Sequence, residues 1–391
     1  MGVNLRKIRV CMLACYYKNA SVANYTKGLI SPLENKKDLK IRLIASHCKC
    51  LRRFPKGQSL LINNCSFLNC PYLSVSSRKL KSLNSLIDRI PQRLLNLFRG
   101  LIYLKACKDC EIIHFHQSSS YAFGFLPLIS LILLSSRKKI VTVHSTDTIQ
   151  KFNFLYKLYN RVDKVIVHSK SMETHLIEKG VSSSRIVKVF HSVDIPHIFG
   201  LERTKITFMG APEERKGILT ILDALKILKR KRINIKVSIY GFYSDHEKKK
   251  TELQAISRKV DDCLIWGGRL SENEFDKKLQ ESLFTLAVYN VATSGSNLVT
   301  RAMANATPVI ASDIGGLREY LDGGGIFLPP GDPEALAEII ESLLKNPELL
   351  EELGSKGRKR ALQLFSREEI AKKTASIYRS LISENRGSVN N

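Results

Sequence analysis

The sequence predicts an α/β protein in which two Rossmann-like domains face each other across a cleft. Its 391 residues are more than one hydrophobic core usually serves. Short apolar runs alternate with amphipathic stretches in both halves, as in βαβ units with parallel sheets. The alternation fails once, in "SVDIPHIFGLER", where Pro196 and Gly200 interrupt it. We therefore predict domains at residues 1–196 and 203–365, followed by a C-terminal helix and frayed tail at residues 366–391.

The first half begins with a strand, because the apolar core of "MGVNLRKIRVCMLACYY" is too short for a signal peptide and lacks a cleavage site. Apolar runs predict strands at Ile8–Cys15, Lys40–Ser46, Glu111–His116, Lys139–His144, Lys164–His168 and Ile186–Phe190. Helical periodicity predicts helices at Val22–Leu33, Ser82–Ala106, Tyr121–Leu134 and Ser171–Glu178. We interpret Leu51–Ser77 as loops around one short strand. The apolar run at 121–136 contains Pro127 and is shorter than the ~20 residues of a spanning helix, which favours a buried helix.

The second half repeats the pattern, beginning with "KITFMG". Its predicted strands are Lys205–Gly210, Lys236–Gly241, Cys263–Trp266, Phe284–Val288, Pro308–Ser312 and Ile326–Leu328. Its predicted helices are Gly217–Lys229, Asp245–Val260, Ser271–Leu279, Asn297–Ala304, Leu317–Leu321 and Pro333–Leu344. Two further helices are expected before the polar tail.

The composition indicates a soluble protein with polyanionic partners. Lys and Arg number 62 against 36 Asp and Glu, a net charge of +26, which favours anionic lipid, nucleic acid or phosphorylated small molecules as partners. The nine cysteines are odd in number and partly within apolar runs, so we expect reduced cytoplasmic thiols rather than a disulfide framework. Cys107 and Cys110 have the spacing of a redox or zinc motif, but no second pair accompanies them, and we expect no metal.

Three features of the second half can receive a phosphate. Ligands of open α/β sheets bind beyond the carboxyl ends of the strands. One predicted strand ends at Gly210, and Lys216 follows at the start of the next helix, where a cation joins free N–H groups that favour an anion. A solvated lysine is the alternative. Gly315 and Gly316 form a second glycine turn before a helix, and this turn is also suited to an anion.

The third such feature is the turn "TSGSN" after the strand at 284–288. Ser294 or Ser296 can cap the helix that begins at Asn297, and Gly295 allows backbone amides to approach a ligand closely. A capped helix without a ligand is the alternative.

These residues belong to an ordered series of motifs. Gly210 with Lys216-Gly217, then "RAMANATPVIASDIGGLREYL", then "GGIFLPPGDPEALAEIIESLL" resemble the nucleotide-sugar-binding half of glycosyltransferase family 4, which has the GT-B fold. The resemblance covers residues ~203–382 and includes Glu319 in a Gly-Gly-x-x-Glu turn. In the first half, "IIHFHQ" and "VTVHSTD" resemble the acceptor domain more loosely.

The resemblance implies a retaining hexosyltransferase that needs no metal or other cofactor and takes a nucleoside diphosphate sugar as co-substrate. Basic side chains and helix N-termini would hold the diphosphate as the bond breaks. Lys216 matches the family's phosphate-binding lysine, and His116 matches the histidine near the transferred sugar, so we predict His116 as the catalytic residue. A buried core histidine is the alternative, with His114 and His116 on the same face of the sheet.

The sequence departs from the family at its two acids. The E-x7-E pattern falls on Thr293 and Arg301, so the carboxylates expected near the sugar and the ribose are missing. Three explanations stay open. The site accepts a different donor, with Arg301 as a phosphate cation and hydroxyls replacing the acids; or the chain is an inactive homologue that binds a nucleotide or a partner protein; or Arg301 is structural and paired with Glu319 or Asp313.

The acceptor is expected to be a polysaccharide or a lipid-linked glycan in cell-surface glycan synthesis, as the resemblance implies. Leucines and isoleucines recur at helical spacing among basic residues in Leu80–Leu104, which suits either an anionic membrane surface or an ordinary core-facing stripe. Nucleic acid is the competing partner, but no aromatic residues are interleaved with the basic patches and no nucleic-acid-binding module is visible. We predict a cytoplasmic protein that is peripheral to the plasma membrane and does not bind nucleic acid.

Overall fold

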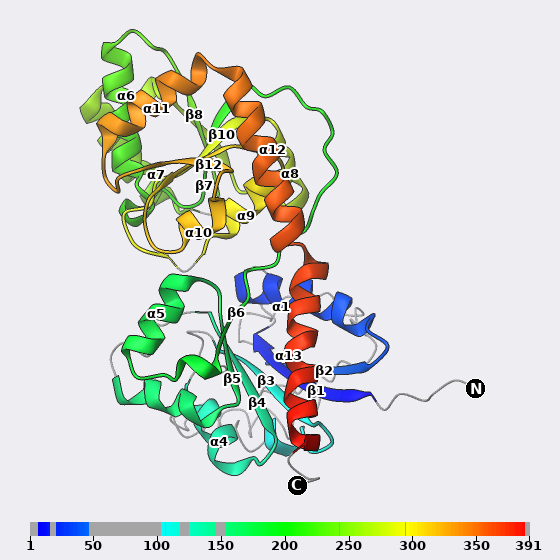
Figure 1. The fold of residues 1–391 in the computed structure, drawn as a ribbon. Coiled ribbons are helices and arrows are strands. Elements are labelled where there is room, and N and C mark those ends of the chain that lie inside the picture. The colour runs from blue at the N-terminus through cyan, green and yellow to red at the C-terminus, as the bar shows by residue number, and fades with distance from the viewer. Residues whose placement is uncertain are drawn as a thin grey trace, which may run out of the picture. The chain divides into compact units, whose positions relative to one another are not determined.

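The computed structural model describes residues 7–15, 21–46, 103–105, 107–117, 125–144, 153–241, 243–293 and 295–387 (Figure 1). Contacts divide the chain into two compact units. The first unit is Met1–Phe190 together with Arg367–Asn391, and the second is His191–Ser366. Each contains one six-stranded parallel sheet with helices, which confirms the predicted α/β class. Among the described residues, no helix combines the length and the hydropathy needed to cross a bilayer.

The first unit has the strand order β2-β1-β3-β4-β5-β6, with every pair parallel. Its strands are β1 Ile8–Cys15, β2 Leu39–Ser46, β3 Ile112–Gln117, β4 Lys138–Val143, β5 Lys164–Val167 and β6 Ile186–Lys188. Its helices are α1 Ser21–Glu34, α4 Phe125–Leu134, α5 Lys170–Glu178, α13 Arg367–Gly387 and the 3-10 segments η3 Asn153–Arg161 and η4 Ser183–Arg185. The predicted helix at Ser82–Ala106 lies almost entirely outside the described residues, as does the interpretation of Leu51–Ser77.

The segment η3 was not predicted, because the apolar residues of Asn153–Arg161 follow no full helical period. The segment is nevertheless part of the core, since its Tyr156 and Tyr159 are fully buried. Phe115 of β3 and Val141 of β4 lie in the same apolar cluster. The central strands of a doubly covered parallel sheet are buried on both faces, which explains why all six residues of β3 are buried.

The last helix does not stand apart from the first unit. We predicted residues 366–391 as a separate segment, but α13 packs against α1 and β1. Arg379 of α13 forms a two-pronged ion pair with Asp38, with N–O distances of 2.7 and 3.0 Å. The chain therefore returns to its first unit after completing the second. Between β6 and the first strand of the second unit, residues 189–204 form no helix and no strand longer than the isolated bridge at Val193.

The second unit has the strand order β12-β11-β10-β7-β8-β9. Its strands are β7 Lys205–Met209, β8 Val237–Tyr240, β9 Leu264–Gly268, β10 Ser282–Ala287, β11 Val309–Ser312 and β12 Gly325–Leu328. Counted along the chain, this is the 3-2-1-4-5-6 order of dinucleotide-binding folds. The order reverses between the neighbouring strands β7 and β10, and ligands of such sheets bind beyond the carboxyl ends at that point.

Helices connect the strands of the second unit. They are η5 Glu214–Lys216, α6 Ile218–Arg230, α7 Asp245–Arg258, η6 Asp261–Cys263, α8 Glu272–Gln280, α9 Asn297–Ala304, α10 Leu317–Leu321, α11 Pro333–Leu344 and α12 Pro347–Leu364. Local signals fix many of these ends: Ser244 and Ser271 each form a capping box, and Asp332 caps a helix with proline in its first turn. The predicted bounds of α9, α10 and α11 are confirmed to the residue.

Candidate functional site

The loop after β7 places an ammonium group over a glycine. Gly210 has a φ of 143°, and a Cβ atom at this position would stand 2.5 Å from Lys216 Nζ. Gly217, with a φ of 77°, packs so closely on the end of β10 that a Cβ would meet the Val288 carbonyl oxygen at 1.8 Å. The two glycines therefore let the lysine-bearing turn lie against the mouth of the sheet.

Lys216 has the electrostatics of an anion receiver. It is half-buried, and burial lowers the pKa of its amine, with Arg215 lowering it further. Within the part of the chain that the structure describes, its Nζ makes no hydrogen bond or ion pair. Glu213 is near enough to raise that pKa in part but is not bonded to Nζ. A partly desolvated cation without a bonded carboxylate gains when an anion binds beside it. The geometry is thus compatible with the predicted phosphate contact.

The turn after β10 is held by its own side chains. Thr293 Oγ1 donates to the Gly295 carbonyl at 2.7 Å. Ser296 caps α9, since its Oγ accepts from Val299 N, and it also bonds Tyr289 Oη at 2.9 Å. Asn297 is exposed at the start of α9. Ser294 lies outside the described residues, so its predicted donor contact stays a prediction.

The glycine pair after β11 packs directly on that turn. Gly315 has a φ of 59°, and a Cβ there would meet the Thr293 carbonyl oxygen at 2.5 Å. The Gly316 N–H donates to the same carbonyl at 2.8 Å. Glu319 follows one turn later in α10, half-buried. The residue that replaces the family's first acid therefore joins the two turns through its backbone.

Asn290 ties the β7 turn to the β10 turn, and sequence reasoning did not single it out. Its N–H donates to the Arg215 carbonyl at 3.0 Å, and its side-chain amide donates to the Glu214 carbonyl at 2.9 Å. The loops after β7, β10 and β11 are thus linked at the carboxyl edge where the strand order reverses. An asparagine just past a strand end is the signal that could have identified it.

Arg301 is held by the neighbouring helix α8, and its contact with the donor stays a prediction. Its guanidinium binds Glu272 at 2.6 Å and Asp276 at 2.9 Å. It also stacks on Phe275, with 4.2 Å to the ring centroid. Only 11% of its side chain is exposed. Since α8 takes up this cation, the structural explanation fits best, but with acids of α8 rather than Glu319 or Asp313 as partners.

The acids of α8 were visible in the sequence. Glu272 and Asp276 stand four residues apart in "ENEFDKKLQ", so they share one helix face. Asp313 has a different partner, because Arg318 binds it at 2.7 Å through Nε. Arg301 in place of an acid could indicate a changed ligand. Its pairing with the acids of α8 gives the arginine a structural role.

Three histidines of the first unit form a hydrogen-bonded series across β3, β4 and β5. His116 Nδ1 lies 3.2 Å from His144 Nε2, and His144 Nδ1 lies 3.1 Å from His168 Nε2. His168 Nδ1 lies 2.8 Å from the Val189 carbonyl oxygen. The rings of His114 and His116 lie with centroids 4.3 Å apart and are tilted by 31°, which confirms that these two side chains share a sheet face.

The carbonyl at the end of this series sets the tautomers. Burial lowers the pKa of His168 to about 4 and the pKa of His116 well below its ordinary value, so both rings are neutral near pH 7. A carbonyl only accepts, so His168 carries its proton on Nδ1 and accepts at Nε2. When His144 is also neutral, it donates from Nδ1 and accepts at Nε2, and His116 donates from Nδ1.

One ring nitrogen is left over. His116 Nε2 is then a buried lone pair, and it has no hydrogen-bond partner among the described residues. If His144 gained a proton, it would donate from both nitrogens, and the free nitrogen of His116 would become a donor instead. His116, the predicted catalytic residue, is fully buried. Its tautomer depends on His144 and His168, which the family resemblance did not connect to it.

Known families and known proteins both resemble this chain. Residues 196–360 match the family described as Glycosyl transferases group 1, and residues 71–196 match Glycosyltransferase Family 4. The O-antigen chain mannosyltransferase C of Escherichia coli is 23% identical over 300 residues, 70% of this chain and 76% of that protein. The phosphatidyl-myo-inositol mannosyltransferase of Mycobacterium leprae is 26% identical over 291 residues, 70% of this chain and 74% of that protein.

A solved structure extends the likeness over nearly the whole chain. The crystal structure of the Anabaena protein HepE in complex with UDP has a TM-score of 0.71 and 13% identity. The match covers 95% of this chain and 100% of that one. At this identity the likeness shows the fold alone, and it is consistent with the two parallel sheets described above.

Proposed function

This chain belongs to the group 1 glycosyltransferases of family 4, which have the GT-B fold and are retaining hexosyltransferases that use nucleoside diphosphate sugars, and we propose that its second unit binds the donor diphosphate at Lys216. The observation that carries this proposal is the half-buried ammonium held over Gly210, with no bonded carboxylate among the described residues, at the point where the strand order reverses. A bound diphosphate supplies the missing negative charge.

The leaving group is the part of the reaction that this site can assist. As the bond to the sugar breaks, negative charge grows on the diphosphate, and a fixed cation stabilises that charge more than it stabilises the bound donor. The N–H groups of Gly295 and Gly316 already donate to Thr293, so the proposed assistance rests on Lys216. No proton transfer from Thr293 or Arg301 is required for this assistance.

The sugar side of the site is proposed to use hydroxyls and amides in place of acids. Thr293 and Ser296 line the turn where the family carries its first acid, and Asn297 is exposed at the start of α9. In the first unit, His116 Nε2 would accept a hydrogen bond from a sugar hydroxyl once a ligand reaches it. His144 and His168 act as positioning residues, because they fix the ring's tautomer.

The acceptor is proposed to be a cell-surface glycan or a lipid-linked sugar. The two relatives described above are named for an O-antigen chain and for a phosphatidyl-myo-inositol, which supports acceptors of this kind. A protein acting on them would work at the cytoplasmic face of the membrane. Leu80–Leu104, which suits either a membrane surface or a core-facing stripe, lies outside the described residues except for Tyr103 and Leu104, and these two pack in the core of the first unit.

The first experiment is Lys216→Ala with nucleoside diphosphate binding measured by calorimetry. Removing one charge-assisted contact is expected to weaken binding about 10- to 100-fold. Lys359→Ala, an exposed lysine of α12, is the matched control and should bind as the unaltered chain does. Equal affinities for the two variants would disprove the diphosphate assignment. Binding that is intact without any sugar transfer would favour the inactive homologue.

A further inference from the structure

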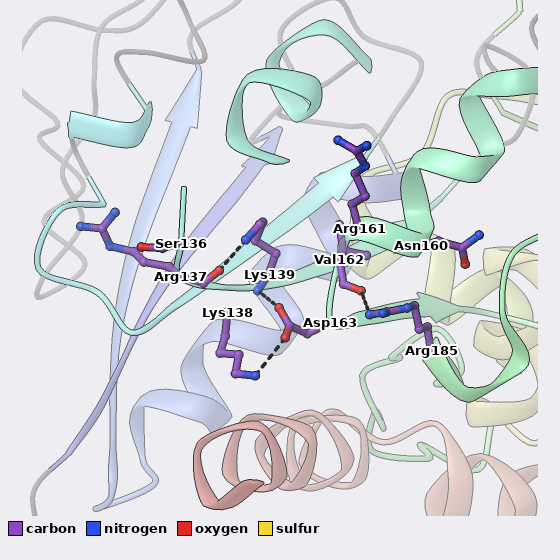
Figure 2. A pocket seen from close by; sticks show the side chains of 9 residues that line it. All are labelled: Ser136, Arg137, Lys138, Lys139, Asn160, Arg161, Val162, Asp163 and Arg185. Atoms are coloured by element: carbon purple, nitrogen blue, oxygen red, sulfur yellow. Dashed lines mark hydrogen bonds and ion pairs between the residues drawn. The ribbon is translucent and has the colours of Figure 1, made fainter. Parts of the chain in front are cut away.

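A basic pocket lies at the amino-terminal edge of the first unit's sheet. It has a volume of about 340 Å³ and is formed by the segments that lead into β4, β5 and β6 (Figure 2). Its charged lining residues are Arg137, Lys138, Lys139, Arg161, Asp163 and Arg185. Since α/β sheets bind their substrates at the opposite, carboxyl edge, this pocket is separate from the predicted catalytic machinery.

The pocket keeps most of its positive charge. Five cationic residues and one carboxylate line the pocket, and Asp163 is already paired, because it binds Lys138 Nζ at 3.1 Å and the Lys139 backbone N–H at 2.7 Å. Four positive charges remain. Figure 2 shows these contacts, and it shows no interaction that reaches Arg161. Arg161 is exposed and makes no hydrogen bond or ion pair within the described ranges.

Neutral carbonyl groups hold the other cations in place. Arg137 donates to the Cys110 and Lys108 carbonyls at 3.1 and 2.6 Å. Lys139 Nζ donates to the Ser135 carbonyl at 2.8 Å, and burial lowers the pKa of this amine. Arg185 donates to the Val162 carbonyl at 2.5 Å. Carbonyl partners orient these groups without cancelling their charge, so the pocket is prepared for an anion with several oxygen acceptors.

Two exposed leucines precede the pocket in the chain. Leu133 and Leu134 end α4 and are 58% and 60% exposed, whereas Leu128 and Leu131 of the same helix are buried in the core. Ser136, the first residue that lines the pocket, follows Leu134 by two positions. A soluble phosphate compound would make no use of these side chains. Apolar side chains next to uncancelled cations are the combination that binds the interface of an anionic bilayer.

We propose that this pocket binds phosphate groups at an anionic membrane surface, with Arg161 and Arg185 meeting the headgroups and Leu133 and Leu134 entering the acyl boundary. This proposal rests on the proposed function in one respect: membrane binding would bring the enzyme to a lipid-linked acceptor. Its location was not expected from the sequence, in which Leu80–Leu104 suits either a membrane surface or a core-facing stripe.

The test is flotation of the full chain with vesicles of phosphatidylcholine, with or without phosphatidylglycerol. The chain should float with the anionic vesicles and much less with the neutral ones. Arg185→Gln combined with Arg161→Gln should lower the vesicle partition about 30-fold at low salt and much less at high salt. Leu133→Ser combined with Leu134→Ser should lower it at both salt concentrations.

The matched control is Lys249→Gln combined with Leu253→Ser on α7. That helix also carries exposed lysines and an exposed leucine, so the control removes the same kinds of side chain from the second unit. The control should float normally. Loss of flotation only in the α7 variant, or equal flotation with both kinds of vesicle, would overturn the proposal. Inorganic phosphate binding that needs Arg161 while flotation ignores the leucines would assign the pocket to a soluble anion instead.

Failure of this proposal can be told apart from failure of the proposed function. Lys216→Ala should float as the unaltered chain does, and the pocket variants should bind nucleoside diphosphates normally. Unchanged thermal unfolding of each variant would show that the chain remains folded. If the pocket variants fail to float while no nucleotide binds to any variant, the membrane site stands and the donor assignment falls.

Discussion

At the scale of single residues, this molecule combines an unpartnered cation with neutral histidines. Lys216 and His116 lie in different units, yet burial shapes both: it lowers the pKa of each group and leaves one nitrogen of each without a partner among the described residues. Motifs in the sequence pointed to both side chains. Their state of protonation depends on what surrounds them, which the motifs do not encode.

Gly210 tests how the lysine is held. Gly210→Ala should weaken nucleoside diphosphate binding, because the new methyl group would displace Lys216 Nζ. It should also destabilise the second unit by about 1–2 kcal/mol, since an alanine is strained at this φ. Gly323→Ala is the matched control, because Gly323 also has a positive φ but open space around it. Thermal unfolding should show similar destabilisation for both variants. Calorimetry should show weaker nucleoside diphosphate binding for Gly210→Ala alone.

The buried histidines predict a loss of stability in acid. The pKa of His168 is about 4 in the folded protein against ~6.5 when unfolded, so the unfolded chain binds more protons between these values. Stability should therefore fall as pH drops from about 6.5 to 4, by about 3 kcal/mol for this ring. In urea titrations over this range, His168→Gln should reduce the slope of stability against pH by about one proton. An unchanged slope would contradict the assignment.

At the scale of elements, α8 and α9 are joined by a charge cluster that the sequence did not reveal as such. Arg301 projects from α9 and is held by two acids of α8 and by the Phe275 ring. The substitution that looked like a changed active site therefore works as a link between helices. This leaves the missing acid at Thr293 as the departure that bears on the donor.

Replacing Arg301 should change stability rather than binding. Arg301→Gln is expected to lower the free energy of unfolding of the second unit by about 1–3 kcal/mol, because Asp276 loses its cation in a partly buried place. Arg318→Gln removes an exposed pair and should cost less than about 1 kcal/mol. Chemical denaturation gives the first quantity, and nucleoside diphosphate titration should be the same for both. A binding defect confined to Arg301→Gln would return it to the donor site.

At the scale of the whole molecule, the chain closes its first unit with its last helix. Tyr378 of α13 is fully buried and lies 2.7 Å from His114 Nδ1 through its hydroxyl. His114 Nε2 lies 2.7 Å from Thr142 Oγ1. The final segment thus supports the layer of side chains on which His116 stacks.

Tyr378→Ala should therefore destabilise the first unit, although the residue follows the second unit in sequence. Loss of a fully buried aromatic side chain costs about 3–5 kcal/mol. Hydrogen exchange should speed up in β1 and α1 and stay constant in β10 and β11. Lys372→Ala, on the exposed face of α13, is the control and should leave all four segments unchanged. Faster exchange confined to the second unit would show that α13 does not belong to the first.

The sequence by itself determined the α/β class, nearly all strand and helix positions, and the motifs at Gly210, Lys216 and Gly315. These are local signals: alternation of apolar runs, capping residues and glycine turns depend on neighbours close in the chain. The bounds of α9 were readable because Ser296 caps it and its apolar face is regular. The family resemblance rested on the same local patterns.

Only the tertiary structure decided the partners of Arg301, the connection of His116 to His168, the return of α13 and the basic pocket around Arg161. Each depends on residues that are distant in sequence and meet only when strands pair and helices pack. Such contacts leave no periodic trace in the chain, because one charged or polar side chain can be satisfied by many alternative partners. Folding selects which partner is near, and that selection determines which cations remain available for an anion.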